Sequence, residues 1–186
     1  MSKIGIITGS TRDTRVNLQV AQYLKDFAQE KFADHEFEIV DIKDYQLPEF
    51  NEAIPPAYAT ERADANVAKF AEKISSLDGF VFVTPEYNRG ITSGLKNALD
   101  SLSHEWHNKP AGIASYGGQL GAQAAMSLRP ILANLKMASV SSQATFSIMT
   151  DFENMQTFKP AAYHTGNIEA LFADVLLWAK AFETIR

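Results

Sequence analysis

A short run of aromatic and β-branched residues, Phe80 to Val83, is followed at once by a polar segment that contains Pro85. A run of this kind predicts a strand buried on both faces of a sheet. Because proline cannot donate a ladder hydrogen bond, the strand is expected to end there. A helix is expected to begin near Thr92 or Ser93 and to run to about Leu102. Open α/β sheets bind ligands in such an arrangement, at the carboxyl ends of their strands.

The same unit recurs along the chain. The other expected strands are Lys3–Thr8, Phe37–Ile42, Ala111–Ser115 and a strand within Ser139–Ile148. Apolar residues at helical spacing predict helices from about Val16, over Glu61–Leu77, from Ala124 to Leu135 with a kink or break at Pro130, and over Gly166–Ile185. The segment Thr150–Thr165 is expected to be irregular. Without a break in composition, these units predict one domain, residues 1–186, with an α/β, flavodoxin-like fold: a three-layer doubly wound sheet of five parallel strands in the order 2-1-3-4-5.

The composition narrows the class of protein. The chain has 186 residues, of which 46% are hydrophobic, enough to bury one sizeable core. It has no cysteine, which excludes disulfides, thiolate metal sites and a cysteine nucleophile. The formal net charge of −5 argues against nucleic acid as the main partner. Neither a signal peptide nor an apolar run of membrane-spanning length is visible, so a soluble cytoplasmic protein without a membrane partner is expected.

The segment after the first expected strand is rich in groups that bind anions. Its hydroxyls, guanidinium groups and amide belong to Ser10, Thr11, Arg12, Arg15 and Asn17. The N–H groups and the dipole of a helix N-terminus favour an anion, and arginine adds charge-assisted bonds to phosphate. The alternative is an ordinary capped helix with solvated arginines. The Walker and Gly-x-Gly-x-x-Gly patterns are absent, so a standard nucleoside triphosphate or dinucleotide loop is not predicted.

Two more polar segments follow neighbouring strands of the expected sheet. They comprise Pro85, Glu86, Tyr87 and Asn88 after the third strand and Ser115, Tyr116, Gly117 and Gly118 at the end of the fourth. The first offers a rigid edge that can hydrogen-bond a planar heterocycle, and the glycines of the second leave room for a flat ring. An exposed turn and a tight strand–helix turn are the plainer alternatives. Taken together, the three loops favour one elongated ligand, with its phosphate at the first loop and its ring between the other two.

These segments resemble the motifs of the NAD(P)H-dependent FMN reductases, a family that also includes azo-, quinone and chromate reductases. The stretch Gly9–Arg12, with Arg15 and Asn17, is similar to the family's phosphate loop. Pro85-Glu86-Tyr87-Asn88, followed after six residues by Leu95-Lys96-Asn97-Ala98-Leu99-Asp100, is similar to its flavin loop, and Tyr116-Gly117-Gly118 with Gly121 resembles its third loop. Arg15 stands where many members have a small hydroxyl residue, and the segment from Arg89 to Gly94 lacks a proline often found there.

The resemblance implies an oxidoreductase in which NADPH or NADH reduces FMN at N5 and the flavin reduces a small-molecule electron acceptor in a ping-pong cycle. A quinone, an azo dye, a free flavin or a metal oxyanion would be the acceptor. FMN would be held non-covalently by the three loops, including Val16 and Ser115, near the interface of a homodimer or homotetramer. Backbone donors at Gly117 and Gly118 would stabilise the reduced ring, with no catalytic side chain and no metal. An FMN-binding electron carrier or regulatory protein is the alternative, and an α/β protein with another phosphate ligand, or none, is a third.

Other residues have plainer interpretations. Trp106 is expected at the wall of the ring site, at an interface or partly buried in a loop. Trp178 is expected in the core, with a dimer contact as the alternative. Asn97 is expected to tie the flavin loop in place. The segment Lys43–Thr60, with its three prolines, is expected to be a long loop that serves either as a lid or as a surface connection.

Overall fold

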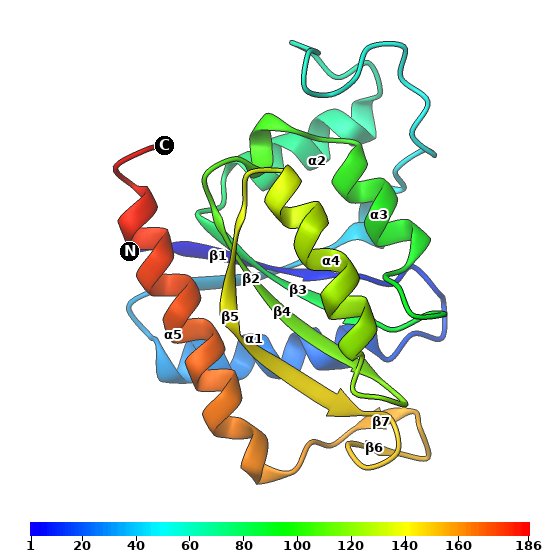
Figure 1. The fold of residues 1–186 in the computed structure, drawn as a ribbon, viewed down its shortest axis with the longest axis vertical. Coiled ribbons are helices and arrows are strands. Elements are labelled where there is room, and N and C mark those ends of the chain that lie inside the picture. Colours follow the sequence, from blue (N-terminus) through cyan, green and yellow to red (C-terminus); the bar gives the residue numbers. More distant parts are fainter.

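The computed structural model describes residues 1–186 and contains a five-stranded sheet in the order β2-β1-β3-β4-β5 (Figure 1). Its strands are β1 (Lys3–Thr8), β2 (Glu36–Asp41), β3 (Gly79–Pro85), β4 (Pro110–Gly117) and β5 (Ala138–Ser147). Every neighbouring pair is parallel. All residues of β3 are buried, as the continuous apolar run predicts for a central strand. The predicted α/β, flavodoxin-like fold and strand order are therefore confirmed.

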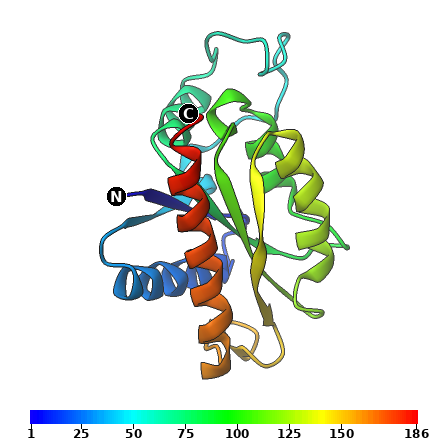
Figure 2. The same ribbon diagram turned by 60° about the vertical axis from the view of Figure 1, so that its left-hand side comes forward.

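Helices cover both faces of the sheet. They are α1 (Asn17–Lys31), α2 (Ala65–Ser75), α3 (Ser93–Asp100), α4 (Ala122–Asn134) and α5 (Thr165–Phe182). Side chains that alternate along the strands, such as Val81 and Phe82, enter two separate cores. One core contains α1 and α5, and the other contains α2, α3 and α4. Figure 2 shows α5 and α4 on opposite sides of β5.

Side-chain caps set the starts of several elements. Asp64 accepts hydrogen bonds from the backbone of Asn66 and Val67, so α2 begins at Ala65 and not at the expected Glu61. In the same way, Thr92 accepts a hydrogen bond from the N–H of the residue three positions later, so α3 begins directly after it. The cap at Asp64, which periodicity does not report, explains why α2 starts later than expected.

The expectation of an irregular segment over Thr150–Thr165 is wrong. It contains an antiparallel hairpin of β6 (Phe152–Glu153) and β7 (Thr157–Phe158), followed by the 3-10 helix η3 (Ala162–His164). Strands of two residues are too short to show alternation, so the sequence pattern could not reveal them. The hairpin lies beyond the end of β5, at the bottom of Figure 1. Helix α4 runs through Pro130 without the expected break.

Both tryptophans differ from their expected positions. Trp106 ends the 3-10 helix η2 (His104–Trp106) and is 0% exposed. Its ring packs against Phe70, Phe80 and Phe82 of one core, so it is neither a wall of the ring site nor a surface residue. Trp178 is 43% exposed, because it lies off the buried stripe of α5. Its interpretation as a core residue is therefore wrong.

Asn97 has a different role from the expected one. Its side-chain nitrogen donates to the carbonyl of Pro48 and its oxygen accepts from the N–H of Phe50, each over 2.8 Å. It therefore fastens the long segment between the 3-10 helix η1 (Ile42–Tyr45) and α2, and not the loop after β3. None of the helices is both long and apolar enough to cross a membrane.

Candidate functional site

The loop between β1 and α1 is fixed at its base by Asn17. The Asn17 side chain accepts a hydrogen bond from the N–H of Gly9 at 3.0 Å and donates one to the carbonyl of Val83 at 2.9 Å. The hydroxyl of Thr92 donates to the carbonyl of Gly9. Asn17 is 0% exposed, and both ends of its amide are engaged within the chain. The amide therefore holds this loop against β3.

Ser10 lies within this loop and is 1% exposed. Its hydroxyl has no hydrogen-bond partner in the chain. A buried polar group without a partner destabilises a folded protein unless something else supplies one. Helix α1 begins at Asn17, at the end of the same loop, and no side chain caps the free N–H groups of its first turn. The loop thus carries an unused donor at a place that favours an anion.

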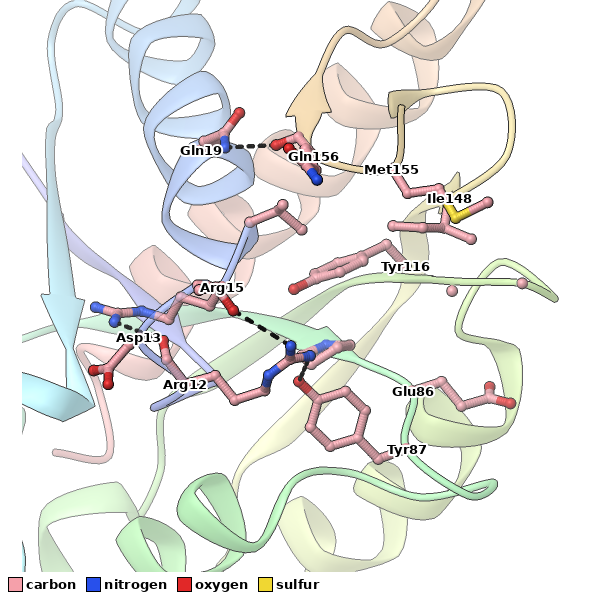
Figure 3. Close-up of a pocket in the computed structure, with 15 residues that line it drawn as sticks. Arg12, Asp13, Arg15, Gln19, Glu86, Tyr87, Tyr116, Ile148, Met155 and Gln156 are labelled. Atoms are coloured by element: carbon pink, nitrogen blue, oxygen red, sulfur yellow. Dashed lines mark hydrogen bonds between the residues drawn. The ribbon is translucent and has the colours of Figure 1, made fainter. Parts of the chain in front are cut away.

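The two arginines of the loop point in different directions (Figure 3). Arg15 forms an ion pair with Asp41 at the end of β2, and only 10% of its side chain is exposed. Arg15 is therefore not a solvated arginine of the kind that the capped-helix alternative requires. Its Nε is buried and has no partner. Arg12 is exposed and reaches the hydroxyl of Tyr87 at 3.4 Å, across the mouth of the site.

The loop after β3 turns tightly, and its residues Pro85, Glu86 and Tyr87 line the site. Tyr87 and Gly90 exchange two backbone hydrogen bonds of 3.0 Å, with Asn88 and Arg89 at φ 49° and 70° in the turn between them. The carboxylate of Glu86 accepts hydrogen bonds from the first N–H groups of α4, the shortest at 2.9 Å. A carboxylate at a helix N-terminus is favourably placed. Glu86 thus joins the loop after β3 to the loop after β4.

Glycines allow close backbone contacts in the loop after β4. Gly121 has φ 69°, and a β-carbon there would lie 2.6 Å from the backbone nitrogen of Tyr116. A β-carbon on Gly117 would meet the β-carbon of Glu86 at 3.3 Å, whereas one on Gly118 would meet nothing within 4 Å. Gly118 therefore borders open space, where a flat ring can approach the backbone.

The three loops enclose one cavity of about 720 Å³. Of the predicted binding residues, those that line it are Arg12, Arg15, Val16, Pro85, Glu86, Tyr87, Tyr116, Gly117 and Gly118. Those that do not are Ser10, Thr11, Asn17, Asn88 and Ser115. The hydroxyl of Ser115 donates to the carbonyl of Leu120, and the residue is 0% exposed. No residue of the segment Lys43–Thr60 lines the cavity.

The cavity has six lining residues that sequence reasoning missed. They are Asp13, Thr14, Gln19, Ile148, Met155 and Gln156. The last three come from the end of β5 and the β6–β7 hairpin, which lies beside Tyr116 (Figure 3). Asp13 and Thr14 lie within the predicted phosphate loop, so their position in the sequence could have identified them. No sequence signal placed the hairpin.

The cavity has a polar end and a more apolar end. Arg12, Asp13 and Arg15 lie at the first, while Tyr116, Ile148 and Met155 lie at the second (Figure 3). Burial raises the pKa of the Tyr116 hydroxyl, so this group stays protonated at neutral pH and can donate a hydrogen bond. A hydrogen bond from Lys43 lowers the pKa of Asp13, which is therefore ionised.

The chain is similar to several known reductases. A family model described as NADPH-dependent FMN reductase matches residues 2–151. An NAD(P)H-dependent FMN reductase of Saccharomyces cerevisiae is 40% identical over 144 residues, which cover 73% of this chain and 75% of the relative. A 2-hydroxy-1,4-benzoquinone reductase of a Burkholderia species is 36% identical over 120 residues, which cover 64% and 57%. The flavoenzyme NAD(P)H:(acceptor) oxidoreductase FerB of Paracoccus denitrificans has the same fold, with a TM-score of 0.73, 22% identity and coverage of 95% and 98%.

Proposed function

Because the chain belongs to the family of NADPH-dependent FMN reductases, we propose that the cavity between its three loops binds FMN and that a small-molecule acceptor is reduced there. The protein is an FMN-dependent NAD(P)H oxidoreductase. We propose its site residues, its kinetic scheme and the class of its acceptor.

The phosphate of FMN would bind at the polar end of the cavity. The observation that carries this proposal is the buried hydroxyl of Ser10, which does not itself line the cavity but lies in the same loop as the lining residues Arg12 and Arg15 and has no partner in the chain. The Nε of Arg15 is unpartnered as well. Phosphate oxygens accept hydrogen bonds from both kinds of donor, and the N-terminus of α1 adds its free N–H groups. The exposed guanidinium of Arg12 would supply further positive charge at the rim.

The ring of FMN would lie between the loops after β3 and β4. The backbone at Gly118 is open on the cavity side, and Tyr87 and Tyr116 stand on either side of the space (Figure 3). Asn17 and Ser115, which were predicted as ligands, hold the loops through side-chain hydrogen bonds to backbone groups, and Asn88 forms the tight turn after β3 with a positive φ. They are therefore proposed as positioning residues.

Bound FMN supplies the two-electron chemistry. In the net reaction with a quinone, NAD(P)H gives up a hydride, a proton comes from solvent, and NAD(P)⁺ and a hydroquinone are formed. We infer a quinone-type acceptor because a benzoquinone reductase is among the relatives. The carboxylate of Glu86 is engaged with α4, and that of Asp13 with Lys43. Both carboxylates that line the cavity are therefore engaged within the chain, and we propose a ping-pong reaction without a side-chain base.

The visible spectrum of the purified protein tests this function. After incubation with FMN, the protein should retain oxidised flavin, and anaerobic NADPH or NADH should bleach it. The faster donor would give the nucleotide preference. Flavin that persists under both donors would favour the electron-carrier or regulatory alternative, and a protein that takes up no FMN would overturn the proposal.

Assembly and location remain predictions. We propose a homodimer or homotetramer of one-domain chains, located in the cytoplasm, that binds neither nucleic acid nor membrane. The exposed Leu177 and Trp178 on α5 are compatible with a subunit contact. Light scattering on the eluting protein would give the mass of the assembly, and a monomeric mass would contradict it.

A further inference from the structure

The β6–β7 hairpin is built as a rigid wall of the cavity. Asp151 closes the base of the hairpin. One oxygen of its carboxylate accepts a hydrogen bond from the N–H of Ser147, and the other lies 2.8 Å from Nε2 of His164. Both Asp151 and His164 are buried. The ring of Phe158 packs edge-on against Tyr23 of α1 and Phe146 of β5. Buried polar contacts and ring packing on both sides fix the hairpin without help from a ligand.

Gln19 joins the hairpin to the helix that starts at the phosphate loop. Its side-chain nitrogen donates to the carbonyl of Gln156, and its oxygen accepts from the N–H of Phe158, each over 2.9 Å. The amide thus pairs with the hairpin backbone as a neighbouring strand would. It holds the hairpin tip at the edge of the cavity (Figure 3).

The tip residue Met155 has a conformation that methionine does not favour. Asn154 and Met155 are the central residues of the turn that the N–H of Gln156 closes on the carbonyl of Glu153, and they have φ 51° and 57°. Asparagine and glycine suit these positions, but a methionine in the left-handed region is strained. An observed outlier of this kind is a reason to seek a function. The Met155 side chain is 55% exposed, and it lies with Ile148 at the apolar end of the cavity (Figure 3).

We propose that Met155 is a specificity-determining residue that contacts a planar, apolar acceptor such as a naphthoquinone. The proposal rests on the proposed FMN-dependent function. The phosphate is assigned to the loop after β1 and the ring to the loops after β3 and β4, so the hairpin borders the remaining side of the cavity. A polarisable thioether next to Ile148 and Tyr116 suits a flat aromatic surface. The hairpin starts at Phe152, just beyond the residues that the family model matches.

Met155→Gly removes the Met155 side chain and keeps a residue that suits the turn. Glycine relieves the left-handed strain, so the melting temperature should stay the same or rise. Loss of the thioether should weaken the binding of menadione to the oxidised, FMN-loaded protein about five-fold. Binding is measured without NAD(P)H, from the change in flavin absorbance. FMN affinity and the KM for ferricyanide, which is not planar, should not change.

Asn154→Gly is the matched control, because it changes the same turn and keeps the methionine. It should bind menadione as the unaltered protein does, and Met155→Leu should retain most of the affinity. Unchanged menadione affinity in Met155→Gly, an equal loss in Asn154→Gly, or a loss of FMN affinity in place of menadione affinity would each overturn the proposal. Failure of the unaltered protein to bind FMN would instead overturn the proposed function.

Discussion

Replacement of Ser10 by alanine should change two measured quantities in opposite directions. The Ser10 hydroxyl is buried and has no partner in the chain. An unpaired buried hydroxyl costs roughly 1–3 kcal/mol, so the FMN-free variant should unfold with a free energy higher by about 1 kcal/mol. The same change removes a hydrogen bond to a charged phosphate, which contributes about 1.5–3 kcal/mol. FMN should therefore bind about 10- to 150-fold more weakly.

The assay for Ser10→Ala combines urea unfolding of the FMN-free protein with a flavin fluorescence titration. Ser101 offers a matched control, because it is 4% exposed and its hydroxyl donates to the carbonyl of Asn97 at 2.7 Å. Ser101→Ala should lower the free energy of unfolding by about 1 kcal/mol and leave FMN affinity unchanged. Unchanged FMN affinity in Ser10→Ala, or a destabilised FMN-free protein, would refute the assignment of this hydroxyl to the phosphate.

Three further changes test other parts of the site and the fold. Arg12→Ala should weaken FMN binding about ten-fold by titration and leave urea stability within about 0.5 kcal/mol, because Arg12 is exposed. Arg15→Ala should instead lower the free energy of unfolding by about 2–3 kcal/mol, because Asp41 loses its cation in a mostly buried pair; equal stability of the two variants would contradict this. Gly118→Val should fill the open side of the loop and abolish flavin uptake in a protein that melts normally, and normal uptake would remove this loop from the ring site. Burial lowers the pKa of Lys109 to about 8 in the folded protein. Between about pH 8 and 10.5 the unfolded chain therefore binds more protons than the folded one, because lysine in an unfolded chain has a pKa of about 10.5. The free energy of unfolding should rise by about 3 kcal/mol across that window. Urea unfolding should show this rise in the unaltered protein but not in Lys109→Met, and parallel curves would contradict it.

The sheet could be predicted from the sequence because each strand carries a local signal. Lys3–Thr8 was predicted with its observed bounds, and the run from Phe80 to Val83 lies inside β3. The order of the strands followed from the repeated strand–helix unit. The three loops that form the cavity were predictable as well, because each directly follows a predicted strand. Nine of the predicted residues line the cavity, because loops that follow adjacent parallel strands must meet at one edge of the sheet.

The remaining features depend on contacts between distant segments. Arg15 of the loop after β1 pairs with Asp41 at the end of β2, and no local pattern predicts that pairing. Trp106 stands in a polar sequence, yet three phenylalanines from other elements surround its ring. The hairpin that carries Met155 depends on Gln19 of α1, far away in the sequence. These features are set by tertiary packing, which single-sequence periodicity does not report.

Helix α1 connects the two ends of the cavity. Its first residue, Asn17, binds the backbone of the phosphate loop and of β3, and Gln19 in the same turn binds the hairpin. Because both amides are rigidly spaced on one helix, a displacement of the phosphate loop would also move the hairpin. Removal of the Met155 side chain, by contrast, leaves every contact of Asn17 and Gln19 in place, because Gln19 binds the hairpin only through backbone atoms. With FMN and the acceptor bound as proposed, changes at the hairpin tip should alter acceptor affinity without loss of FMN, whereas changes at the base of α1 should affect both.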